Sequence, residues 1–266
     1  MRRVIFLKLG GSLITEKDKS AKPRVDVILR VAGEIAEARI ADPEIRLLLG
    51  HGSGSFGHTS AAKYGTRQGV RTPEEWVGFR QVWRDAAALN HIVMDALIAK
   101  GLPAITFPVS SSAVAYDGEI ARWEFAPIEA ALQRNLLPVI YGDVIIDEVR
   151  GGTVISTEEL FYYLARRLKP GKIFLAGVES GIFSDFPSKG QMIQSITTTT
   201  YSDIASKLQG SIDTDITGGM AAKVQLMVEL IGELQDCEAF IFSGFEKGNV
   251  FKALTGERLG TQLTFS

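Results

Sequence analysis

Short runs of consecutive apolar residues recur along the chain, and segments with helical spacing separate them. The runs lie at residues 4–9, 46–49, 104–107, 137–141, 172–176 and 239–243. Continuous apolar runs of this length are typical of strands that are buried on both faces of a parallel sheet. The intervening segments at about 25–40, 73–100, 125–135 and 220–234 have the periodicity of helices that connect parallel strands. The sequence therefore predicts an α/β fold, a three-layer αβα sandwich with a mostly parallel central sheet.

Two helix starts are marked by capping boxes. Thr72 is followed by a proline and then by Glu75, and Ser156 is followed at the same spacing by Glu159. A hydroxyl with a glutamate three residues later satisfies two backbone N–H groups at a helix N-terminus, and proline favours the first helical position. We therefore expect helices to begin directly after Thr72 and Ser156. Residues 177–215 are rich in Ser, Thr, Asp and Gly, and we expect loops with short strands there.

The composition limits the class of protein. The 266 residues are 45% hydrophobic and 23% charged, as in ordinary globular enzymes, with a formal charge of -2. No basic block is long enough to follow a phosphodiester backbone, so we expect no nucleic-acid partner. Cys237 is the single cysteine, which excludes an internal disulfide and fits a reducing compartment.

Lys8 ends the N-terminal apolar run too early for an export signal, and no run approaches the ~20 residues of a membrane span. We therefore expect a cytoplasmic protein without a membrane partner.

The first candidate for phosphate binding is the sequence Lys8-Leu9-Gly10-Gly11-Ser12, with Lys17 beyond it. It places a cation at the end of a strand beside glycines, whose backbone N–H groups can approach a phosphate closely. The chain contains no Gly-x4-Gly-Lys-Ser/Thr sequence, so this is not a Walker A loop. Taken alone, the motif also fits a tight turn between a strand and a helix, with solvated lysines.

The second candidate is the sequence His51-Gly52-Ser53-Gly54-Ser55-Phe56-Gly57-His58, which follows the second predicted strand. Its glycines match Gly-x-Gly-x-x-Gly, but a dinucleotide-binding fold also needs an acidic residue at the end of the next strand, about 20 residues later. The glutamates found there belong to the capping box after Thr72. We interpret the segment as a loop in which glycine N–H groups and His58 donate to a phosphate. A histidine that is not accompanied by such glycines more often has a structural role than a functional one.

The third candidate runs from Asp215 to Lys223, with Gly218 and Gly219 at the start of a helix and the lysine one turn inside it. A helix N-terminus offers free N–H groups and the positive end of the helix dipole, and a lysine adds a full charge. The same residues also fit an ordinary helix start followed by a surface lysine.

The three candidates share one position in the expected fold, because each follows a strand or opens a helix. In a parallel sheet such loops meet at the carboxyl ends of the strands, where ligands bind. We therefore predict a single anion-binding cleft that gathers Lys8, Lys17, His58 and Lys223.

Taken together, these motifs resemble those of the amino acid kinase superfamily over nearly the whole chain. The opening strand ends in Lys8 to Ser12, a second glycine loop follows, and Thr217-Gly218-Gly219-Met220 with Lys223 lies near the end. Within the superfamily, the segment from His51 to His58 is similar to the loop of isopentenyl phosphate kinases, whose histidine holds the acceptor phosphate. The resemblance implies one domain, with an acceptor-binding lobe at about 1–150 and a nucleotide-binding lobe at about 151–266.

The resemblance also implies a role for individual residues. The expected ATP contacts are Lys8, Leu9, Gly10, Gly11, Ser12, Gly54, Gly218, Gly219 and Lys223. The expected contacts of the acceptor are Ser53, Gly54, Gly57, His58 and Gly142. Lys17 would stabilise the transferring phosphoryl group, and Asp143 would orient the lysines. A hydrocarbon pocket is expected beside the long helix, lined by some of Trp76, Phe79, Val82 and Trp83.

The expected reaction is ATP-dependent phosphorylation of isopentenyl phosphate with Mg2+, in a homodimer. Two alternatives stay open: a kinase for fosfomycin or another small phosphate, and a nucleotide-binding sensor or storage protein without catalysis. The chain departs from its relatives at Glu158 or Glu159, where they usually carry Asp, and at 177–182, where they carry an Asp-rich nucleotide loop. These departures concern the adenosine and metal contacts rather than the phosphate loops.

Overall fold

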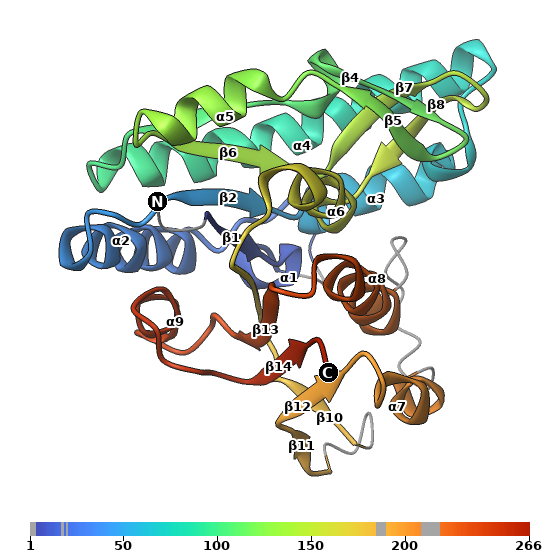
Figure 1. The fold of residues 1–266 in the computed structure, drawn as a ribbon. Coiled ribbons are helices and arrows are strands. Elements are labelled where there is room, and N and C mark those ends of the chain that lie inside the picture. Colours follow the sequence, from blue (N-terminus) through green and yellow to red (C-terminus); the bar gives the residue numbers. More distant parts are fainter. Residues whose placement is uncertain (1–3, 17–18, 20, 185–189, 209–218) are drawn as a thin grey trace.

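A mostly parallel sheet forms the centre of the molecule (Figure 1). The computed structural model describes residues 4–16, 19, 21–184, 190–208 and 219–266. Within them the central sheet has the order β12-β14-β13-β9-β1-β2-β6-β3, and only the pairing of β13 with β14 is antiparallel. Its strands are β1 (Ile5–Leu9), β2 (Leu47–His51), β3 (Ala104–Thr106), β6 (Leu137–Tyr141), β9 (Lys172–Gly177), β12 (Ser195–Thr197), β13 (Glu238–Ser243) and β14 (Thr261–Thr264). The predicted fold class is confirmed.

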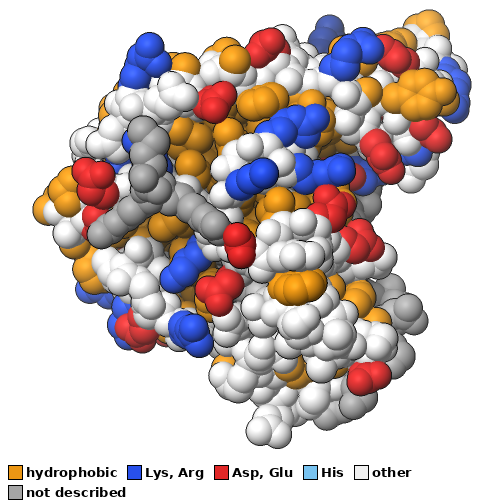
Figure 2. Space-filling model, in the orientation of Figure 1, with side chains coloured by type: hydrophobic (Ala, Val, Ile, Leu, Met, Phe, Trp, Pro, Cys, Tyr) orange, Lys and Arg blue, Asp and Glu red, His pale blue; other side chains and the backbone are white. Residues whose placement is uncertain are grey.

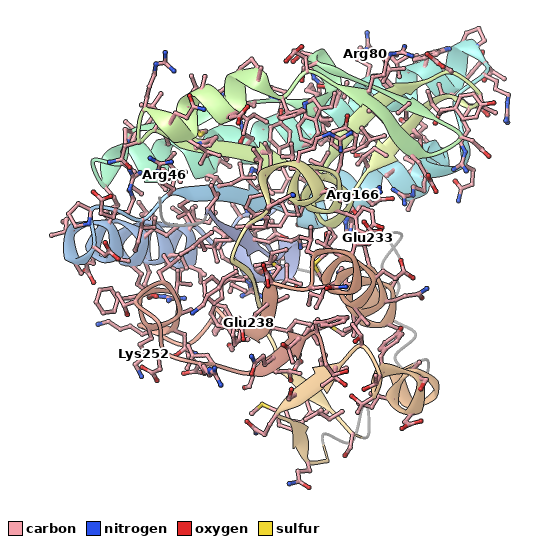
Figure 3. The ribbon with its side chains drawn as sticks, in the orientation of Figure 1. Arg46, Arg80, Arg166, Glu233, Glu238 and Lys252 are labelled. Carbon is pink, nitrogen blue, oxygen red and sulfur yellow. The ribbon has the colours of Figure 1, made fainter. Side chains whose placement is uncertain are left out.

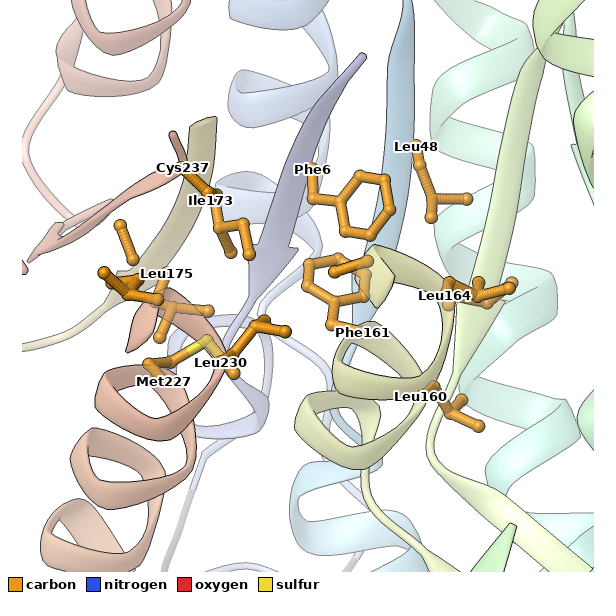
Figure 4. Close-up of a cluster of buried hydrophobic side chains, with 14 of the residues drawn as sticks. Phe6, Leu48, Leu160, Phe161, Leu164, Ile173, Leu175, Met227, Leu230 and Cys237 are labelled. Atoms are coloured by element: carbon orange, nitrogen blue, oxygen red, sulfur yellow. The ribbon is translucent and has the colours of Figure 1, made fainter. Parts of the chain in front are cut away.

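Helices cover both faces of this sheet, because successive side chains of a strand point to opposite sides. Phe6 of β1 packs in a cluster with α5, α6 and α8, whereas Leu7 packs in a cluster with α1, α2, α4 and α9. Figure 4 shows the first cluster, where the ring centroids of Phe6 and Phe161 lie 4.9 Å apart and Cys237 is buried. The helices are α1 (Gly11–Ile14), α2 (Val25–Ala41), α3 (Gly54–Tyr64), α4 (Pro73–Ala99), α5 (Ala126–Gln133), α6 (Thr157–Leu168), α7 (Tyr201–Leu208), α8 (Gly219–Leu234) and α9 (Asn249–Leu254), with short 3-10 turns η1 (Thr66–Gln68) and η2 (Val109–Ser111).

Both predicted capping boxes are present. Thr72 accepts from the Glu75 backbone and Glu75 accepts in return at the start of α4, and Ser156 and Glu159 do the same at the start of α6. The 27 residues of α4 carry a buried face and an exposed face, as the spacing predicted. Among the described helices, none combines the length and the apolar composition needed to cross a bilayer.

A second, smaller sheet of four strands stands beside the central one, in the order β5-β4-β7-β8. Its strands are β4 (Ala113–Tyr116), β5 (Glu119–Trp123), β7 (Asp143–Asp147) and β8 (Gly151–Ile155). This sheet was not predicted, because its strands have four or five residues each and the apolar residues of β5 and β8 are interrupted by polar residues and glycines. The predicted lobe boundary near residue 150 falls in the turn between β7 and β8, which pair as a hairpin.

Helices α6 and α8 lie side by side on the first face of the sheet, and polar contacts link their exposed sides. Arg166 of α6 forms an ion pair of 2.9 Å with Glu233 of α8, and Tyr162 donates to the same carboxylate; Figure 3 labels the ion pair. Figure 2 shows Lys and Arg side chains grouped near the centre of the view, in the region where Figure 1 draws α6. Arg166 and Arg167 belong to the last turn of α6, where cations complement the helix dipole. This basic group is therefore explained by the helix end.

Two expectations about loops were wrong. The segment from His51 to His58 is a loop only as far as Ser53, because α3 begins at Gly54 and carries His58 in its second turn. In the described residues of the segment 177–215, the expected short strands are present, including the hairpin of β10 (Ile182–Phe183) with β11 (Met192–Ile193), but the helix α7 was not expected. Residues 185–189 and 209–215 lie outside the described part of the chain. In both cases glycine and hydroxyl residues, which are common in loops, occupy or precede the first turn of a helix.

Candidate active site

The first two glycine loops lie against each other. Strands β1 and β2 are parallel neighbours in which Lys8 is paired with Gly50, so the loops that follow them leave the sheet together. A Cβ atom on Gly11 would stand only 2.6 Å from the backbone N and Cα of Gly54. Because these are backbone atoms, no side-chain rotation could relieve the contact. The glycines are therefore needed for the packing of one loop on the other, as well as for access to a ligand.

Backbone N–H groups of both loops are available to an anion. In the described part of the chain, the N–H groups of Gly11, Ser12, Ser53 and Gly54 have no hydrogen-bond acceptor. Gly54 has a φ of +49°, a left-handed conformation that glycine adopts without strain. Consecutive N–H groups at the start of a helix form a concave site for phosphate oxygens. The geometry thus supplies donors from two loops at one edge of the sheet.

Two of the predicted lysines meet at a buried carboxylate. Lys8 Nζ lies 3.0 Å from Glu158 Oε1, and Lys223 Nζ lies 4.0 Å from the same oxygen. Lys8 and Glu158 are 6% and 5% exposed, so this charge cluster is largely shielded from water. Burial by itself raises the pKa of the Glu158 carboxyl, but the ammonium groups of Lys8 and Lys223 outweigh it and hold the pKa below its usual value. The site therefore holds an ionised carboxylate between two cations.

Lys8 and Lys223 contact Glu158, whereas Asp143 has hydrogen bonds with Ser110 and Val144. Asp143 accepts from the Ser110 hydroxyl at 2.7 Å and from the backbone N–H of Val144 at 2.8 Å. Burial raises the pKa of its carboxyl to about 6, although these hydrogen bonds lower it. Asp143 is the first residue of β7, and its side chain contacts Ser110 of η2. Its role in orienting the lysines stays a prediction.

The two adjacent glutamates of α6 make different contacts, which the sequence pattern alone did not distinguish. Glu159 closes the capping box and pairs with Arg67 at 2.7 Å. Glu158, one position earlier, points to the lysines. The capping box was the signal that could have identified it, because the box already accounts for Glu159 and leaves Glu158 free for another role.

The predicted acceptor contacts lie along the start of α3 and beside it. His58 is half-buried and follows Gly54 by one turn, which corresponds to about 6 Å along the helix axis. Gly57 is packed on Ser53, since a Cβ there would come within 2.6 Å of the serine side chain. Gly142 follows the neighbouring strand β6 and donates to the carbonyl of His51 at 3.2 Å. These residues thus share the edge of the sheet with the glycine loops.

The third motif is partly outside the described residues. Lys17 and Gly218 lie outside them, as do Asp215 and Thr217. Gly219 is the first residue of α8, and Lys223 lies one turn inside that helix, as predicted.

Buried polar residues beneath the second loop were also missed. His51 is fully buried, with Nδ1 3.1 Å from the Gly52 carbonyl and Nε2 3.2 Å from Asn90 Oδ1 of α4. Its ring stacks on Tyr141, and burial lowers its pKa, which favours the neutral imidazole. The carbonyl of His51 also accepts from the Thr157 hydroxyl at 2.6 Å. His51 therefore connects the second loop to both α4 and the start of α6.

The apolar residues expected to line a hydrocarbon pocket have mixed surroundings. Val82 is buried in a small cluster with Ala61 of α3 and Val144 of β7, and Phe79 packs against that cluster. Trp76 packs on Phe79, and Trp76 and Trp83 are 38% and 46% exposed. The face of α4 that was expected to hold the hydrocarbon therefore packs on α3, the helix that carries His58.

Comparison with known proteins identifies the family. The amino acid kinase family matches residues 3–243, which include both glycine loops, Glu158 and Lys223. The chain belongs to the amino acid kinase family. The sequence resemblance at the level of the superfamily is thereby confirmed.

Several members of the amino acid kinase family resemble the chain over its full length. Isopentenyl phosphate kinase from Methanocaldococcus jannaschii is 34% identical, and the match covers 98% of each chain. The enzyme of the same name from Methanothermobacter thermautotrophicus is 33% identical over 98% of this chain and 99% of its own. A crystal structure of isopentenyl phosphate kinase superposes with a TM-score of 0.83 at 31% identity, covering 98% of this chain and all of the other.

Proposed function

We propose that this protein is an isopentenyl phosphate kinase, which transfers the γ-phosphoryl group of ATP to isopentenyl phosphate and forms isopentenyl diphosphate. The main support is the contact between two N–H-rich loops beside the Lys8, Glu158 and Lys223 cluster, which can hold two phosphate groups close together. The full-length likeness to isopentenyl phosphate kinases supports the identity of the acceptor.

The chemistry of the acceptor explains why the site is rich in cations and N–H donors. A phosphate monoester has a second pKa near 6, so its attacking oxygen is already anionic at neutral pH. No residue has to remove a proton from it, and a general base is unnecessary. The task is to hold two polyanions in line and to stabilise charge on the moving phosphoryl group.

We assign these tasks to residues of the site. Lys8, Lys223 and the N–H groups of Gly11 and Ser12 would bind the ATP phosphates, and Lys17 would stabilise the transferring group. Ser53, Gly54 and His58 would bind the acceptor phosphate. Glu158 would hold the ammonium groups of Lys8 and Lys223 near one carboxylate before ATP binds. Transfer would then be direct, from the first loop to the second.

Mg2+ fits the site as a partner of ATP rather than as a resident ion. Among the described residues, no group of three or more His, Cys, Asp and Glu side chains is placed to hold a metal. Mg2+ in phosphoryl-transfer sites is bound mainly by substrate phosphates and water, with one or two carboxylates. It would neutralise part of the phosphate charge when it arrives with ATP.

The acceptor assay tests this function directly. Purified protein is incubated with ATP and Mg2+, and ADP release is followed with isopentenyl phosphate, fosfomycin and other small phosphates in parallel. We expect the highest kcat/KM with isopentenyl phosphate. A higher value with fosfomycin would assign a different acceptor, and ATP binding without transfer to any of them would indicate a sensor or storage protein.

His58 provides a second test of the acceptor site. His58→Ala removes a donor to a charged phosphate, an interaction of about 1.5–3 kcal/mol, so kcat/KM for isopentenyl phosphate should fall ~10- to 100-fold. His91→Ala is the matched control, because this histidine is exposed on α4. Equal kinetics of the His58 variant and the wild type would exclude its assigned role.

The homodimer and the cytoplasmic location expected from the sequence stay predictions. Light scattering on the purified protein measures the first, and fractionation of the cells that produce it measures the second.

A further inference from the structure

One side chain contacts both glycine loops. Thr15 follows the short helix α1 and is fully buried. Its hydroxyl donates to the carbonyl of Gly11 at 2.8 Å and accepts from the backbone N–H of Ser55 at 3.0 Å. Gly11 belongs to the first loop and Ser55 to the second, 40 residues away from Thr15. A single oxygen atom therefore joins the loop assigned to the donor with the loop assigned to the acceptor.

Helix α3 requires such an acceptor. The first N–H groups of any helix have no acceptor within the helix, and a side chain at the N-cap commonly supplies one. The N-cap of α3 is Ser53, and its side chain makes no capping hydrogen bond. The N–H groups of Phe56 and Gly57 donate to the Ser53 carbonyl, while that of Ser55 donates to Thr15. Thr15 therefore caps α3 from a distant part of the chain.

Glycine at position 54 makes this contact possible. A Cβ on Gly54 would lie 2.2 Å from the Thr15 hydroxyl oxygen and 2.8 Å from the Gly11 carbonyl. Any larger residue would therefore push Thr15 and the first loop away from α3. The requirement for glycine here comes from the Thr15 bridge in addition to the left-handed backbone.

The backbone of Thr15 is held independently of its hydroxyl. Its carbonyl accepts from the Arg24 side chain at 3.2 Å, and it forms an isolated bridge with Pro23. The N–H of Arg24 donates to Ile14 at 2.8 Å. Removal of the hydroxyl should therefore leave the segment in place and remove only the connection between the loops.

We propose that the Thr15 hydroxyl is a positioning group that sets the distance and orientation of the donor and acceptor loops. This inference rests on the proposed phosphoryl transfer between those loops. Each loop remains attached to its own strand, so each substrate should still bind when the bridge is lost. The rate of transfer depends on alignment of the two phosphates, and a misplacement of about 1 Å can lower a rate ~100-fold. Loss of the bridge should therefore lower kcat more than it changes either KM.

The test compares two substitutions at the same position. Thr15→Val keeps the shape of the side chain and removes the hydroxyl, whereas Thr15→Ser keeps the hydroxyl. Thr66→Val is the control, because Thr66 is also buried and its hydroxyl has no hydrogen-bond partner among the described residues. We expect Thr15→Val to lower kcat about 30- to 100-fold, with both KM values changed less than about threefold. Thr15→Ser and Thr66→Val should stay within about threefold of the wild type. An unchanged kcat for Thr15→Val, or an equal loss for Thr15→Ser, would overturn the proposal.

Amide hydrogen exchange gives a readout that does not depend on the acceptor. The Ser55 N–H should exchange faster in Thr15→Val than in the wild type, and Thr15→Ser should restore its protection. Unchanged protection in Thr15→Val would refute the bridge. Failure of the wild type to phosphorylate isopentenyl phosphate would instead refute the proposed substrate, and the exchange measurement would still decide whether Thr15 joins the loops.

Discussion

Among single residues, Glu158 has the largest effect on the charge balance of the candidate site. It is buried between Lys8 and Lys223, at 3.0 and 4.0 Å. An uncompensated buried charge is costly, and removal of one partner of a buried ion pair destabilises a protein by about 3–5 kcal/mol. Before ATP binds, this carboxylate compensates the charge of both lysines. We expect it to help position their ammonium groups for the incoming phosphates.

Substitution of Glu158 should therefore affect both catalysis and folding. For Glu158→Gln we expect kcat/KM to fall ~100-fold, because the lysines lose their fixed orientation, and the free energy of unfolding to fall by about 3 kcal/mol. Glu159→Gln is the matched control: glutamine can keep the capping bond, and loss of the ion pair with Arg67 should cost at most about 1 kcal/mol and leave the kinetics unchanged. Steady-state kinetics and urea unfolding of the two variants check this. Similar kinetic losses in both would show that the start of α6, and not the Glu158 carboxylate, matters.

At the scale of elements, the two glycine loops act as one unit because their backbones touch. The N–H groups without an acceptor among the described residues belong to both loops, and Thr15 connects the loops. The space between Gly11 and Gly54 has no room for even a methyl group. The position of the first loop is consequently tied to the position of α3, which carries His58.

Gly11→Ala tests this coupling. Its Cβ would meet backbone atoms at 2.6 Å, so the loops must separate, and we expect kcat/KM to fall at least ~100-fold. Gly33→Ala is the control, because Gly33 lies inside α2 and its nearest neighbour to a new Cβ is a lysine side-chain carbon at 3.8 Å. That change should leave kinetics intact and raise stability by up to about 1 kcal/mol. A Gly11→Ala enzyme with full activity would show that the loops are not coupled.

Local sequence was sufficient for the elements whose signals are local. Apolar runs and the capping boxes at Thr72 and Ser156 predicted six strands of the central sheet and the helices α4 and α6, because strand burial and N-capping leave patterns among neighbouring residues. The apolar runs did not predict the short strands β12 and β14. The start of α3 at Gly54 could not be predicted from neighbouring residues, since the acceptor for its Ser55 N–H is Thr15, in another part of the chain. The four-stranded sheet was missed because its strands are short and because β5 and β8 have no continuous apolar run.

The candidate site shows the same division. Lys8 and Lys223 were predicted from glycine motifs, and the structure brings both to Glu158. Glu158 was not singled out, although the capping box accounts for Glu159 and leaves the neighbouring carboxylate without a capping role. Asp143 was given its role by analogy, and in the structure its carboxylate accepts from Ser110.

At the scale of the whole molecule, Asp143 lies where the chain connects the two sheets. The chain leaves the central sheet at Tyr141 and enters the four-stranded sheet at Asp143, whose side chain is 1% exposed. An ionised carboxylate at such a position is poorly solvated. The hydrogen bonds from Ser110 and Val144 offset this only in part, since the pKa of the carboxyl is raised to about 6. The folded protein therefore binds a proton at Asp143 more tightly than the unfolded chain does.

This difference gives the unfolding free energy a defined dependence on pH. Since the pKa rises from 3.8 in the unfolded chain to about 6 on folding, the contribution of Asp143 is most favourable below about pH 4 and is lost as the pH rises through 6. The loss corresponds to about 3 kcal/mol at most. Asp143→Asn stays neutral and can still pair with Ser110 and Val144, so its stability relative to the wild type should increase between pH 4 and pH 7. Urea unfolding of both proteins at several pH values measures this difference, in which the contributions of the other carboxylates cancel. A stability difference that is constant over this range would mean that folding does not change the pKa of the Asp143 carboxyl. The connection between the sheets would then be better hydrated than the burial of Asp143 indicates.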